Sequence, residues 1–316
     1  MPFLLALCLT LLAPIPKGGG AYSGHIAVLL AQPTPQILLL KPNGEEVTRV
    51  ILKTVKGQLT DIRQARDGKF AIIGTSEANV GTRYYLVPIL DKGNEKLLYE
   101  TTGYSTTWCI SKDGQTAFFS EVQPQPAAPN VAPPPYKHFA LDIKTGKMSE
   151  IDLGGKYSIV DLGQENDDLL LSHHTKDDGT SHYCLVSRKT KKITEKFDEG
   201  MQQPLLMSNA KSCMLFTNIR NGGGILPPIP VGGGFAGMSF TIKMFDITTK
   251  KTTDITLPTE GDMTNVRSVS ADPEHVAYGW QVKDECRICV TNVPKKTAKT
   301  IYTLKAGELL ADFDWR

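Results

Sequence analysis

A repeated unit of about 45 residues is the feature that most constrains the fold of this chain. Each copy after the first has a turn rich in Asp, Gly, Asn or Lys, followed by a short apolar strand that ends in a small or polar residue, and the first copy begins directly with its strand. In the third copy, Ser111-Lys-Asp-Gly114 precedes Thr116-Ala-Phe-Phe-Ser120. The strands end at Leu30, Gly74, Ser120, Ser172, Thr217 and Gly279, so the intervals are 44, 46, 52, 45 and 62 residues. This period is typical of four-stranded propeller blades.

A second element recurs in phase with the first, namely a strand, a Lys/Gly/Thr turn and another strand. The clearest copies run from Phe139 to Ile151 and from Lys243 to Ile255. Gly in the Lys-Thr-Gly-Lys turn supplies the positive φ that a tight hairpin needs. Each repeat therefore has four strands, a to d, with a and b around the first turn and c and d around the second. No 12-residue window has a helical period, so we expect an all-β chain nearly without helices.

The two ends of the chain complement each other. The first repeat begins directly with strand b, His25 to Leu30, and its missing strand a is found at Leu310 to Arg316. Phe313 and Trp315 match Trp108 and Ile110 of the third repeat. We therefore predict a six-bladed β-propeller of four-stranded antiparallel blades, closed by the C-terminal strand joining the N-terminal blade. The predicted blades are 22–56 plus 309–316, 57–103, 104–155, 156–200, 201–261 and 262–308.

The repeat resembles a known family. The Ser-Lys-Asp-Gly turn at 111–114, the Phe-Phe-Ser strand end at 118–120, the Asp-Ile-Lys-Thr-Gly-Lys hairpin at 142–147 and the terminal Phe-Asp-Trp at 313–315 are similar to the TolB-type propeller repeat. The resemblance covers nearly the whole chain after residue 21, without the N-terminal domain of TolB itself. It implies a six-bladed propeller that is usually exported and often binds proteins.

The first residues are typical of an export signal. Met1 to Ala13 form an apolar segment of signal-peptide length, and Gly19 and Ala21 suit cleavage before Tyr22. We therefore expect a signal peptide at 1–21, a propeller domain at 22–316 and a periplasmic or extracellular location. An N-terminal buried strand is the alternative. The longest apolar run, Phe3 to Pro14, is too short for a transmembrane helix, which needs about 20 residues.

Charge and cysteines exclude other classes. Lys and Arg total 35 against 33 Asp and Glu, which argues against a strongly basic nucleic-acid-binding body. Five cysteines remain after the signal, an odd number that does not suit a disulfide framework. Cys286 and Cys289 lie in a predicted strand, where residues three apart point to opposite faces, so we expect them to serve packing.

Two long insertions follow strand b in the third and fifth repeats, at 122–136 and 221–238. Both should leave the same face of the ring and flank the fourth blade. The first is proline-rich, while the second combines glycines with apolar residues, and exposed apolar loop residues suggest a contact site. The candidate partner-binding residues are Pro126, Pro133, Pro134, Tyr136, Ile225, Leu226, Ile229 and Phe235. A low-complexity insertion without a partner explains the same pattern.

Metal and catalytic candidates are fewer. Asp61, Asp161 and Asp312 are predicted to line the central channel and would suit a divalent cation, together with Thr106, Gln203 and Asn265 as further polar candidates. His174 and His182 would meet across a hairpin and are weak metal candidates. No nucleophile elbow, zinc-protease motif or phosphate loop is found, so we assign no catalytic residue and no cofactor.

We therefore interpret the chain as an exported protein-binding scaffold. We expect a monomer whose partner is a protein or a cell-envelope component and is not a nucleic acid. A hydrolase or lactonase with a divalent cation in the channel is the alternative. The lysine-rich tracts at 189–196 and 295–299 are expected in c–d hairpins on the outer rim, where lysine protects a strand edge.

Overall fold

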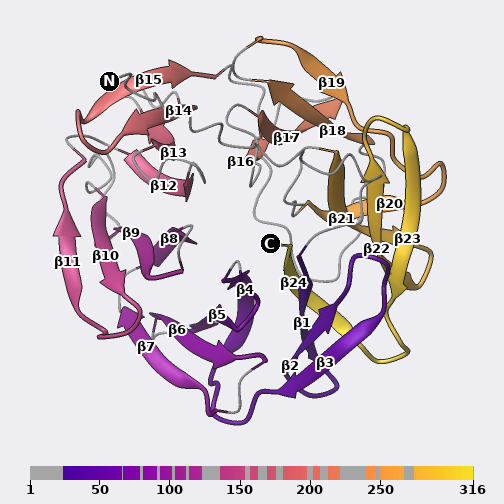
Figure 1. The fold of residues 1–316 in the computed structure, drawn as a ribbon, viewed down its shortest axis with the longest axis horizontal. Helices are drawn as coiled ribbons and strands as arrows, with labels where there is room; N and C mark the ends of the chain where they lie inside the picture. Colours follow the sequence, from indigo (N-terminus) through magenta and orange to yellow (C-terminus); the bar gives the residue numbers. More distant parts are fainter. Residues whose placement is uncertain are drawn as a thin grey trace, which may run out of the picture.

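The computed structural model describes residues 24–315, apart from residue 66 and the segments 79–80, 91–92, 102–103, 112–113, 123–135, 154–156, 163–168, 176–180, 198–201, 207–212, 221–238, 247–248 and 267–273. Every regular element within the described ranges is a β-strand. The strands form antiparallel sheets of four (Figure 1). The prediction of an all-β chain built from four-stranded antiparallel sheets is confirmed.

The sheets follow one another along the chain. The first contains β24 (Leu309–Trp315), β1 (Ile26–Gln32), β2 (Gln36–Leu40) and β3 (Glu46–Ile51). The second contains β4 (Gln58–Gln64), β5 (Phe70–Glu77), β6 (Gly81–Pro88) and β7 (Lys96–Thr101), and the third β8 (Tyr104–Ile110), β9 (Thr116–Val122), β10 (Lys137–Asp142) and β11 (Met148–Ile151).

The later sheets repeat this order. The fourth contains β12 (Tyr157–Leu162), β13 (Leu169–Thr175), β14 (Ser181–Ser187) and β15 (Lys192–Lys196). The fifth contains β16 (Gln202–Leu206), β17 (Cys213–Arg220), β18 (Ser239–Asp246) and β19 (Thr252–Asp254). The sixth contains β20 (Asp262–Val266), β21 (His275–Val282), β22 (Glu285–Asn292) and β23 (Thr297–Thr303). Figure 1 shows the sheets arranged around a common centre, with β15, β19 and β23 on the outer rim.

The core lies between neighbouring sheets, which explains why the second strand of a sheet is apolar on both faces. In β5, Ala71 and Ile73 pack with the first sheet, while Ile72 packs with Trp108 of the third. All three side chains of β5 are fully buried. Consecutive strand residues point to opposite faces, so a continuous apolar run is needed where both faces are covered.

A β-bulge interrupts the pairing of the innermost strand with the second strand in each sheet. The register shifts fall between Leu59 and Asp61, Ser105 and Thr107, Ile159 and Asp161, and Met263 and Asn265, with equivalents in β24 and β16. A bulge bends its strand and redirects the next side chain. The polar residues predicted to line the channel therefore lie at or next to a repeated irregularity of the innermost strands.

The first sheet is assembled from the two ends of the described chain. Its innermost strand β24 pairs with β1, and Trp315 lies opposite Ile26. Relative to the bulge, Phe313 and Trp315 occupy the positions of Trp108 and Ile110, as predicted. Both C-terminal aromatic side chains are fully buried, in a cluster with Ala277, Ile288 and Val290 of the sixth sheet.

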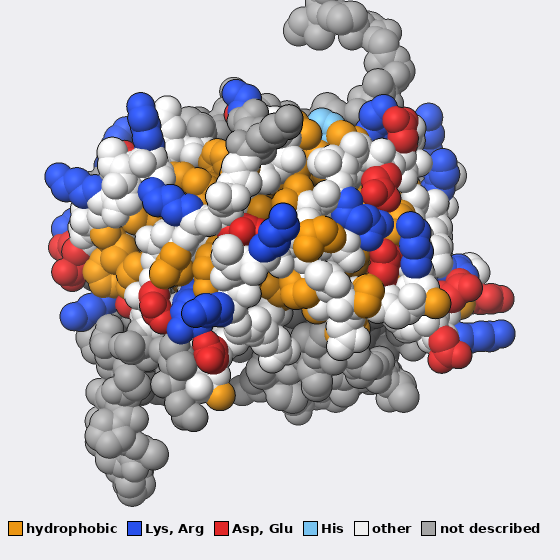
Figure 2. Space-filling view, turned by 90° about the horizontal axis from the view of Figure 1, so that it is seen from below, with side chains coloured by type: hydrophobic (Ala, Val, Ile, Leu, Met, Phe, Trp, Pro, Cys, Tyr) orange, Lys and Arg blue, Asp and Glu red, His pale blue; other side chains and the backbone are white. Residues whose placement is uncertain are grey.

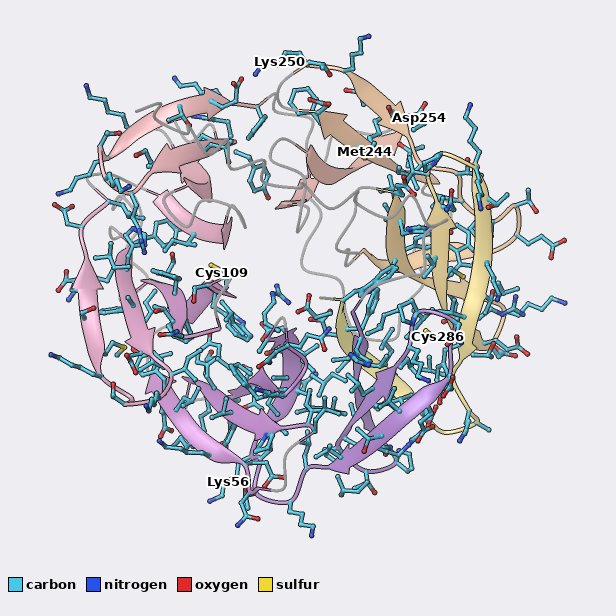
Figure 3. All side chains as sticks on the ribbon, in the orientation of Figure 1. Lys56, Cys109, Met244, Lys250, Asp254 and Cys286 are labelled. Atoms are coloured by element: carbon cyan, nitrogen blue, oxygen red, sulfur yellow. The ribbon has the colours of Figure 1, made fainter. Side chains whose placement is uncertain are left out.

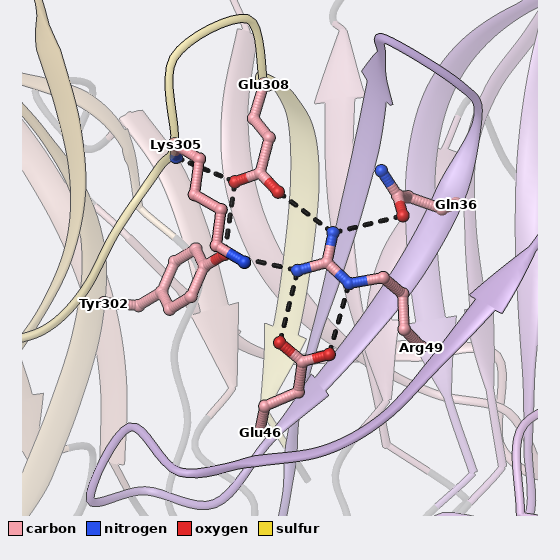
Figure 4. A network of polar contacts seen from close by, with 6 residues as sticks. All are labelled: Gln36, Glu46, Arg49, Tyr302, Lys305 and Glu308. Carbon is pink, nitrogen blue, oxygen red and sulfur yellow. Dashed lines mark hydrogen bonds and ion pairs between the residues drawn. The ribbon is translucent and has the colours of Figure 1, made fainter.

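A polar network lies outside this cluster, at the boundary of the first and sixth sheets (Figure 4). Arg49 on β3 donates to Glu46 with two nitrogens at 3.2 Å, to Gln36 at 3.1 Å and to Glu308 at 2.9 Å. Tyr302 donates to Glu308 at 3.1 Å. Burial opposes ionisation of Glu308, but hydrogen bonds from the Lys305 amide, Arg49 and Tyr302 lower its pKa overall. We call these six residues, Gln36, Glu46, Arg49, Tyr302, Lys305 and Glu308, the boundary network.

Gly44 lies beside this boundary in the turn between β2 and β3. It has a φ of 94°, and a Cβ built on it would lie 1.9 Å from the carbonyl oxygen of Ile301. The close approach of two backbones therefore requires glycine here.

In the described part of the chain, no helix is long and apolar enough to cross a membrane.

Candidate functional site

The two long insertions leave equivalent positions in their sheets. One connects β9 to β10 and the other connects β17 to β18, so each follows the second strand, as predicted. We call the edge of the sheets at which these second strands end the insertion edge. Pro126, Pro133, Pro134, Ile225, Leu226, Ile229 and Phe235 lie outside the described residues. Tyr136 is described and marks the end of the first insertion.

Tyr136 lies beside a buried histidine at the base of the first insertion. Its ring stacks on that of His138, with centroids 6.4 Å apart and an interplanar angle of 22°. His138 is 3% exposed, and its Nδ1 lies 3.0 Å from Oγ of Ser120 on β9. The same Oγ accepts a 2.7 Å hydrogen bond from the amide of Ile159 on β12. The contact therefore links the insertion to the junction of the third and fourth sheets.

Burial decides the charge state of His138. Its Nδ1 shares one hydrogen bond with Ser120 Oγ, in which the donor depends on the ring tautomer. Nε2 has no hydrogen-bond partner among the described residues. Burial lowers the pKa of His138 to about 4, against a smaller opposite effect of Asp152. The ring is therefore neutral at pH 7 and serves as a structural hydrogen-bond partner of Ser120.

A second buried polar contact lies next to the first. Glu121, one residue after Ser120, is 2% exposed and accepts a short hydrogen bond from Tyr99 on β7. Burial and Glu121 raise the pKa of Tyr99 well above its usual range. Two neighbouring residues at the end of β9 thus bind side chains of different strands, which fixes the start of the first insertion in space.

Two of the predicted channel carboxylates, Asp61 and Asp312, bind side chains and amides of neighbouring innermost strands. We call these two residues, together with Arg63 and Trp108, the latch. Asp312 is 1% exposed, accepts a 3.1 Å hydrogen bond from the Ile62 amide and lies 3.5 Å from the Arg63 guanidinium. Asp61 accepts a 2.8 Å hydrogen bond from Nε1 of Trp108. The guanidinium of Arg63 lies 5.6 Å from the Trp108 ring centroid, within the range of a cation–π contact. The first three sheets are thus connected through Asp312, Arg63, Trp108 and Asp61.

The small residue that ends each apolar repeat strand has a role here. Gly74 lies opposite Asp61, and a Cβ on Gly74 would come within 2.3 Å of the Asp61 carboxylate oxygen. The carboxylate can therefore approach the strand only because the facing residue is glycine. In the sixth sheet, Gly279 faces Asn265 in the same register.

The latch is extended by residues that the sequence did not single out. Asp314 on β24 is 4% exposed and accepts a 2.9 Å hydrogen bond from the Gln64 amide. Asp312 and Asp314 alternate along one strand and bind alternate amides of β4. The only sequence signal for this pair is their spacing of two, which places both side chains on one face.

Other channel candidates are placed by their backbones. Asp161, Thr106, Gln203 and Asn265 lie on innermost strands β12, β8, β16 and β20, and their side chains lie outside the described part. A cation site formed by Asp61, Asp161 and Asp312 stays a prediction. The described carboxylates, Asp61 and Asp312, already bind hydrogen-bond donors of neighbouring sheets.

The structure bears differently on the predicted metal role of the histidine pair and on the predicted packing role of the cysteine pair. His174 lies directly opposite His182 in the pairing of β13 with β14, and His182 is buried. The side chain of His174 is not described, and the described residues hold no group of three or more metal-ligating side chains. Cys286 packs in the cluster shared with the first sheet and Cys289 in the cluster shared with the fifth. The prediction that the cysteines point to opposite faces is confirmed.

No model of a known protein family and no curated protein matches the sequence. Solved structures do match. TolB from Acinetobacter baumannii superposes with a TM-score of 0.65 at 13% identity, over 94% of this chain and 67% of that chain. The structure titled putative TolB from Agrobacterium tumefaciens has a TM-score of 0.58 at 9% identity, over 93% of this chain and 94% of that chain. A chain of a nidogen/laminin complex has a TM-score of 0.58 at 9% identity, over 93% of this chain and 98% of that chain.

These identities are low enough that the likeness concerns the fold. An oligogalacturonate lyase from Vibrio parahaemolyticus also matches, with a TM-score of 0.51 at 15% identity over 85% of this chain and 71% of that chain. A chain of a two-protein complex and an enzyme thus share the architecture, so function has to be argued from the sites. The four-stranded sheets, the repeated turns and these superpositions together show that the chain has the TolB-like β-propeller fold.

Proposed function

We propose that the sheets form a closed, six-bladed propeller. Support comes from the boundary of the first and sixth sheets. There β24 completes the first sheet, the buried cluster around Trp315 includes residues of both sheets, and the boundary network bridges them. Closure would leave no exposed inner strand and would make the ring a rigid support for its connecting loops.

We infer further that the ring is a protein-binding scaffold, with the contact surface at the insertion edge. The observation that carries this proposal is the anchoring of the first insertion. Ser120, Glu121 and His138 at its base are buried and hydrogen-bonded, although they adjoin a long proline-rich connection. A binding loop gains affinity when its ends are held by a rigid framework, because less conformational entropy is lost on binding. Among the solved structures that match, one chain comes from a nidogen/laminin complex, an assembly of two proteins.

The proposed location is outside the cytoplasm. It rests on the apolar segment from Met1 to Ala13 and on the small residues Gly19 and Ala21. Cleavage before Tyr22 would be seen as a mature N-terminus by mass spectrometry of the protein recovered from its native cells. A protein recovered with residues 1–21 intact would contradict this part of the proposal.

Deletion of each insertion tests the scaffold. Variants lacking 124–134 or 222–236 should unfold at the same temperature as the parent, while chemical cross-linking in native cells should no longer join them to the partner. Gly146→Asn, in a hairpin turn of the opposite edge, is the matched control and should keep the cross-link. A deletion variant that folds and still gives the full cross-linked product would refute the insertion edge as the contact surface.

The alternative hydrolase or lactonase has weaker support. It requires Asp61 and Asp312 to bind a divalent cation, but both carboxylates accept hydrogen bonds within the latch. Calorimetric titration with Ca²⁺ and Zn²⁺ separates the two proposals. Stoichiometric binding that is lost in Asp312→Asn would favour the enzyme.

A further inference from the structure

One turn is built repeatedly in the hairpins that join the third and fourth strands of the sheets. In the third sheet, the Thr145 amide donates to Asp142 at 2.7 Å, and Gly146 follows with a φ of 71°. In the fifth sheet, the Thr249 amide donates to Asp246 at 2.9 Å, and Lys250 follows with a φ of 59°. In both turns a Thr amide donates to the Asp three residues earlier, and the residue after the Thr is left-handed, glycine in one turn and lysine in the other.

Lysine takes this left-handed position in three consecutive sheets. Lys191, Lys250 and Lys296 have φ values of 55°, 59° and 52° in the fourth, fifth and sixth sheets. Within the described ranges, every non-glycine residue with positive φ is a lysine, the fourth being Lys283. A side chain in this conformation is strained, and glycine would relieve the strain. Retention of a strained residue is a reason to look for a function of its side chain.

Ion pairs between sheets explain only part of the pattern. Lys191 forms an ion pair with Asp152, and Lys250 forms one with Glu195, with 2.5 Å between Nζ and the carboxylate oxygen in both. In each pair the acidic residue belongs to the preceding sheet. The side chains of Lys191 and Asp152 are 47% and 73% exposed, and exposed pairs stabilise little. Lys296 has no ion pair within the described part of the chain. Ion pairing between sheets therefore does not account for all three lysines.

The surrounding residues give this rim an excess of basic residues, which is large in the fourth and sixth sheets. The hairpin from Lys243 to Asp254 of the fifth sheet has three basic and two acidic residues. Between Arg188 and Lys196 there are five basic residues and one acidic residue, and between Asn292 and Lys305 there are four basic residues and no acidic residue. The hairpin from Lys41 to Arg49 instead balances two basic residues with two acidic ones. Figure 1 shows β15, β19 and β23 as neighbouring outer strands, and Figure 3 shows Lys250 at the outer rim between the first two.

The chemistry of this basic rim narrows the kind of partner. Threonines alternate with the lysines, as at Thr190, Thr194 and Thr297, and their hydroxyls suit the hydroxyl groups of sugars. Among the residues whose burial is described, the exposed large hydrophobic ones belong to the first two sheets and are Val47, Ile51, Leu90 and Leu97. The described basic rim therefore offers neither an aromatic platform for stacked bases nor apolar side chains for insertion into a bilayer.

We propose that the rim formed by the hairpins of the fourth, fifth and sixth sheets binds an acidic polysaccharide. The lysines contact its carboxylate or sulfate groups, and the curved rim follows a flexible polymer rather than a flat surface. This site is separate from the insertion edge, so deletion of 222–236 leaves it intact.

Binding to polygalacturonate and to heparin, as carboxylated and sulfated probes, tests the proposal. The variant Lys192→Glu/Lys296→Glu/Lys299→Glu should bind at least about tenfold more weakly at low salt, and its affinity should depend less on salt. The control Lys41→Glu/Lys144→Glu/Lys147→Glu alters balanced hairpins and should stay within about twofold of the parent. Equal loss in both variants, or binding of neither probe by the parent, would overturn the proposal.

Two further arms separate this role from a structural one. Lys191→Gly/Lys250→Gly/Lys296→Gly should bind the probes more weakly yet unfold at a higher temperature, whereas a structural role predicts a lower one. Asp152→Asn/Glu195→Gln frees two lysines and should strengthen binding. Single-stranded DNA or anionic phosphatidylserine vesicles bound as tightly as either polysaccharide would show that the partner class is wrong.

Discussion

The joint that completes the first sheet and the junctions of the third, fourth and fifth sheets are held in different ways. At the joint, β24 continues from the sixth sheet and β1 to β3 lead into the second, so two separate stretches of chain meet without a covalent link. Buried aromatic residues and the boundary network bind them. The later junctions, where the chain runs directly from sheet to sheet, also contain buried clusters, such as the one with Phe118 and Ile159, but their ion pairs between sheets, such as Lys191–Asp152, are exposed.

This difference indicates where stability is concentrated. The view from the side of β3 and β7 shows basic, acidic and hydrophobic side chains interspersed (Figure 2). The basic rim instead has an excess of one sign and strained turns. A surface that keeps strain and like charges contributes little to stability, which suits a surface whose role is contact. The following changes test that contrast, from the largest expected effect to the smallest.

Trp315→Ala should have the largest effect. The side chain is fully buried in the cluster that joins the first and sixth sheets, and truncation of a buried tryptophan costs about 4 kcal/mol. Urea unfolding monitored by circular dichroism measures the change. Leu97→Ala on β7, whose parent residue is 46% exposed, is the control and should change the free energy of unfolding by less than about 0.5 kcal/mol. Similar losses of unfolding free energy in the two variants would show that the joint between the first and sixth sheets does not contribute more to stability than an exposed position.

Gly44→Ala should cost about 3 kcal/mol, because a Cβ would overlap the Ile301 backbone and force the first and sixth sheets apart. Gly146→Ala is a matched control in the equivalent turn of the third sheet. Its φ is also positive, but no atom lies within 4 Å of the new Cβ, so only about 1 kcal/mol of strain is expected. Equal thermal shifts in the two variants would show that the boundary does not need the close approach.

His138 makes the junction of the third and fourth sheets sensitive to acid. Its pKa is about 4 in the folded state, below its ordinary value of 6.5, so the unfolded state takes up a proton first as pH falls. Stability should be complete above pH 6.5 and decline by about 2 kcal/mol between pH 6.5 and 5. In His138→Gln this part of the decline should be absent. Unfolding curves that fall equally in both proteins would assign the effect to other groups.

Arg49→Met and Lys250→Met compare a part-buried with an exposed charge. Loss of Arg49 leaves Glu308, whose side chain is 5% exposed, without its cation, and should cost about 1–2 kcal/mol. Loss of Lys250 should change stability by less than about 0.5 kcal/mol, because its pair with Glu195 is exposed to water. Chemical denaturation of both variants at low and high salt provides the measurement. A larger cost for Lys250→Met would reverse the proposed distribution of stability.

Most of the fold was predictable from local patterns. Turns such as Asp142 to Lys147 and apolar runs such as Ala71 to Ile73 recur in phase, and each is decided by residues close in the sequence. The match of Phe313 and Trp315 to the third repeat was also visible, because the repeat itself supplied the template. Element order follows once six copies are aligned.

Contacts between distant residues were not predictable. Arg49 and Glu308 are 259 positions apart, and neither belongs to a repeated motif. Asp61 and Asp312 were expected on innermost strands, where they lie, but their hydrogen bonds to Trp108 and Ile62 depend on how adjacent sheets are rotated. His138 carries no sequence signal for burial, since histidine has only an intermediate tendency to be buried.

The pairing of β24 with β1 also has a kinetic meaning. Five sheets can form from neighbouring segments, whereas the first requires Ile26 to meet Trp315 across almost the whole described chain. Loop-closure entropy makes such an encounter slow unless the intervening chain is already compact. The first sheet should therefore be completed last, in a single late step that follows the formation of the other sheets.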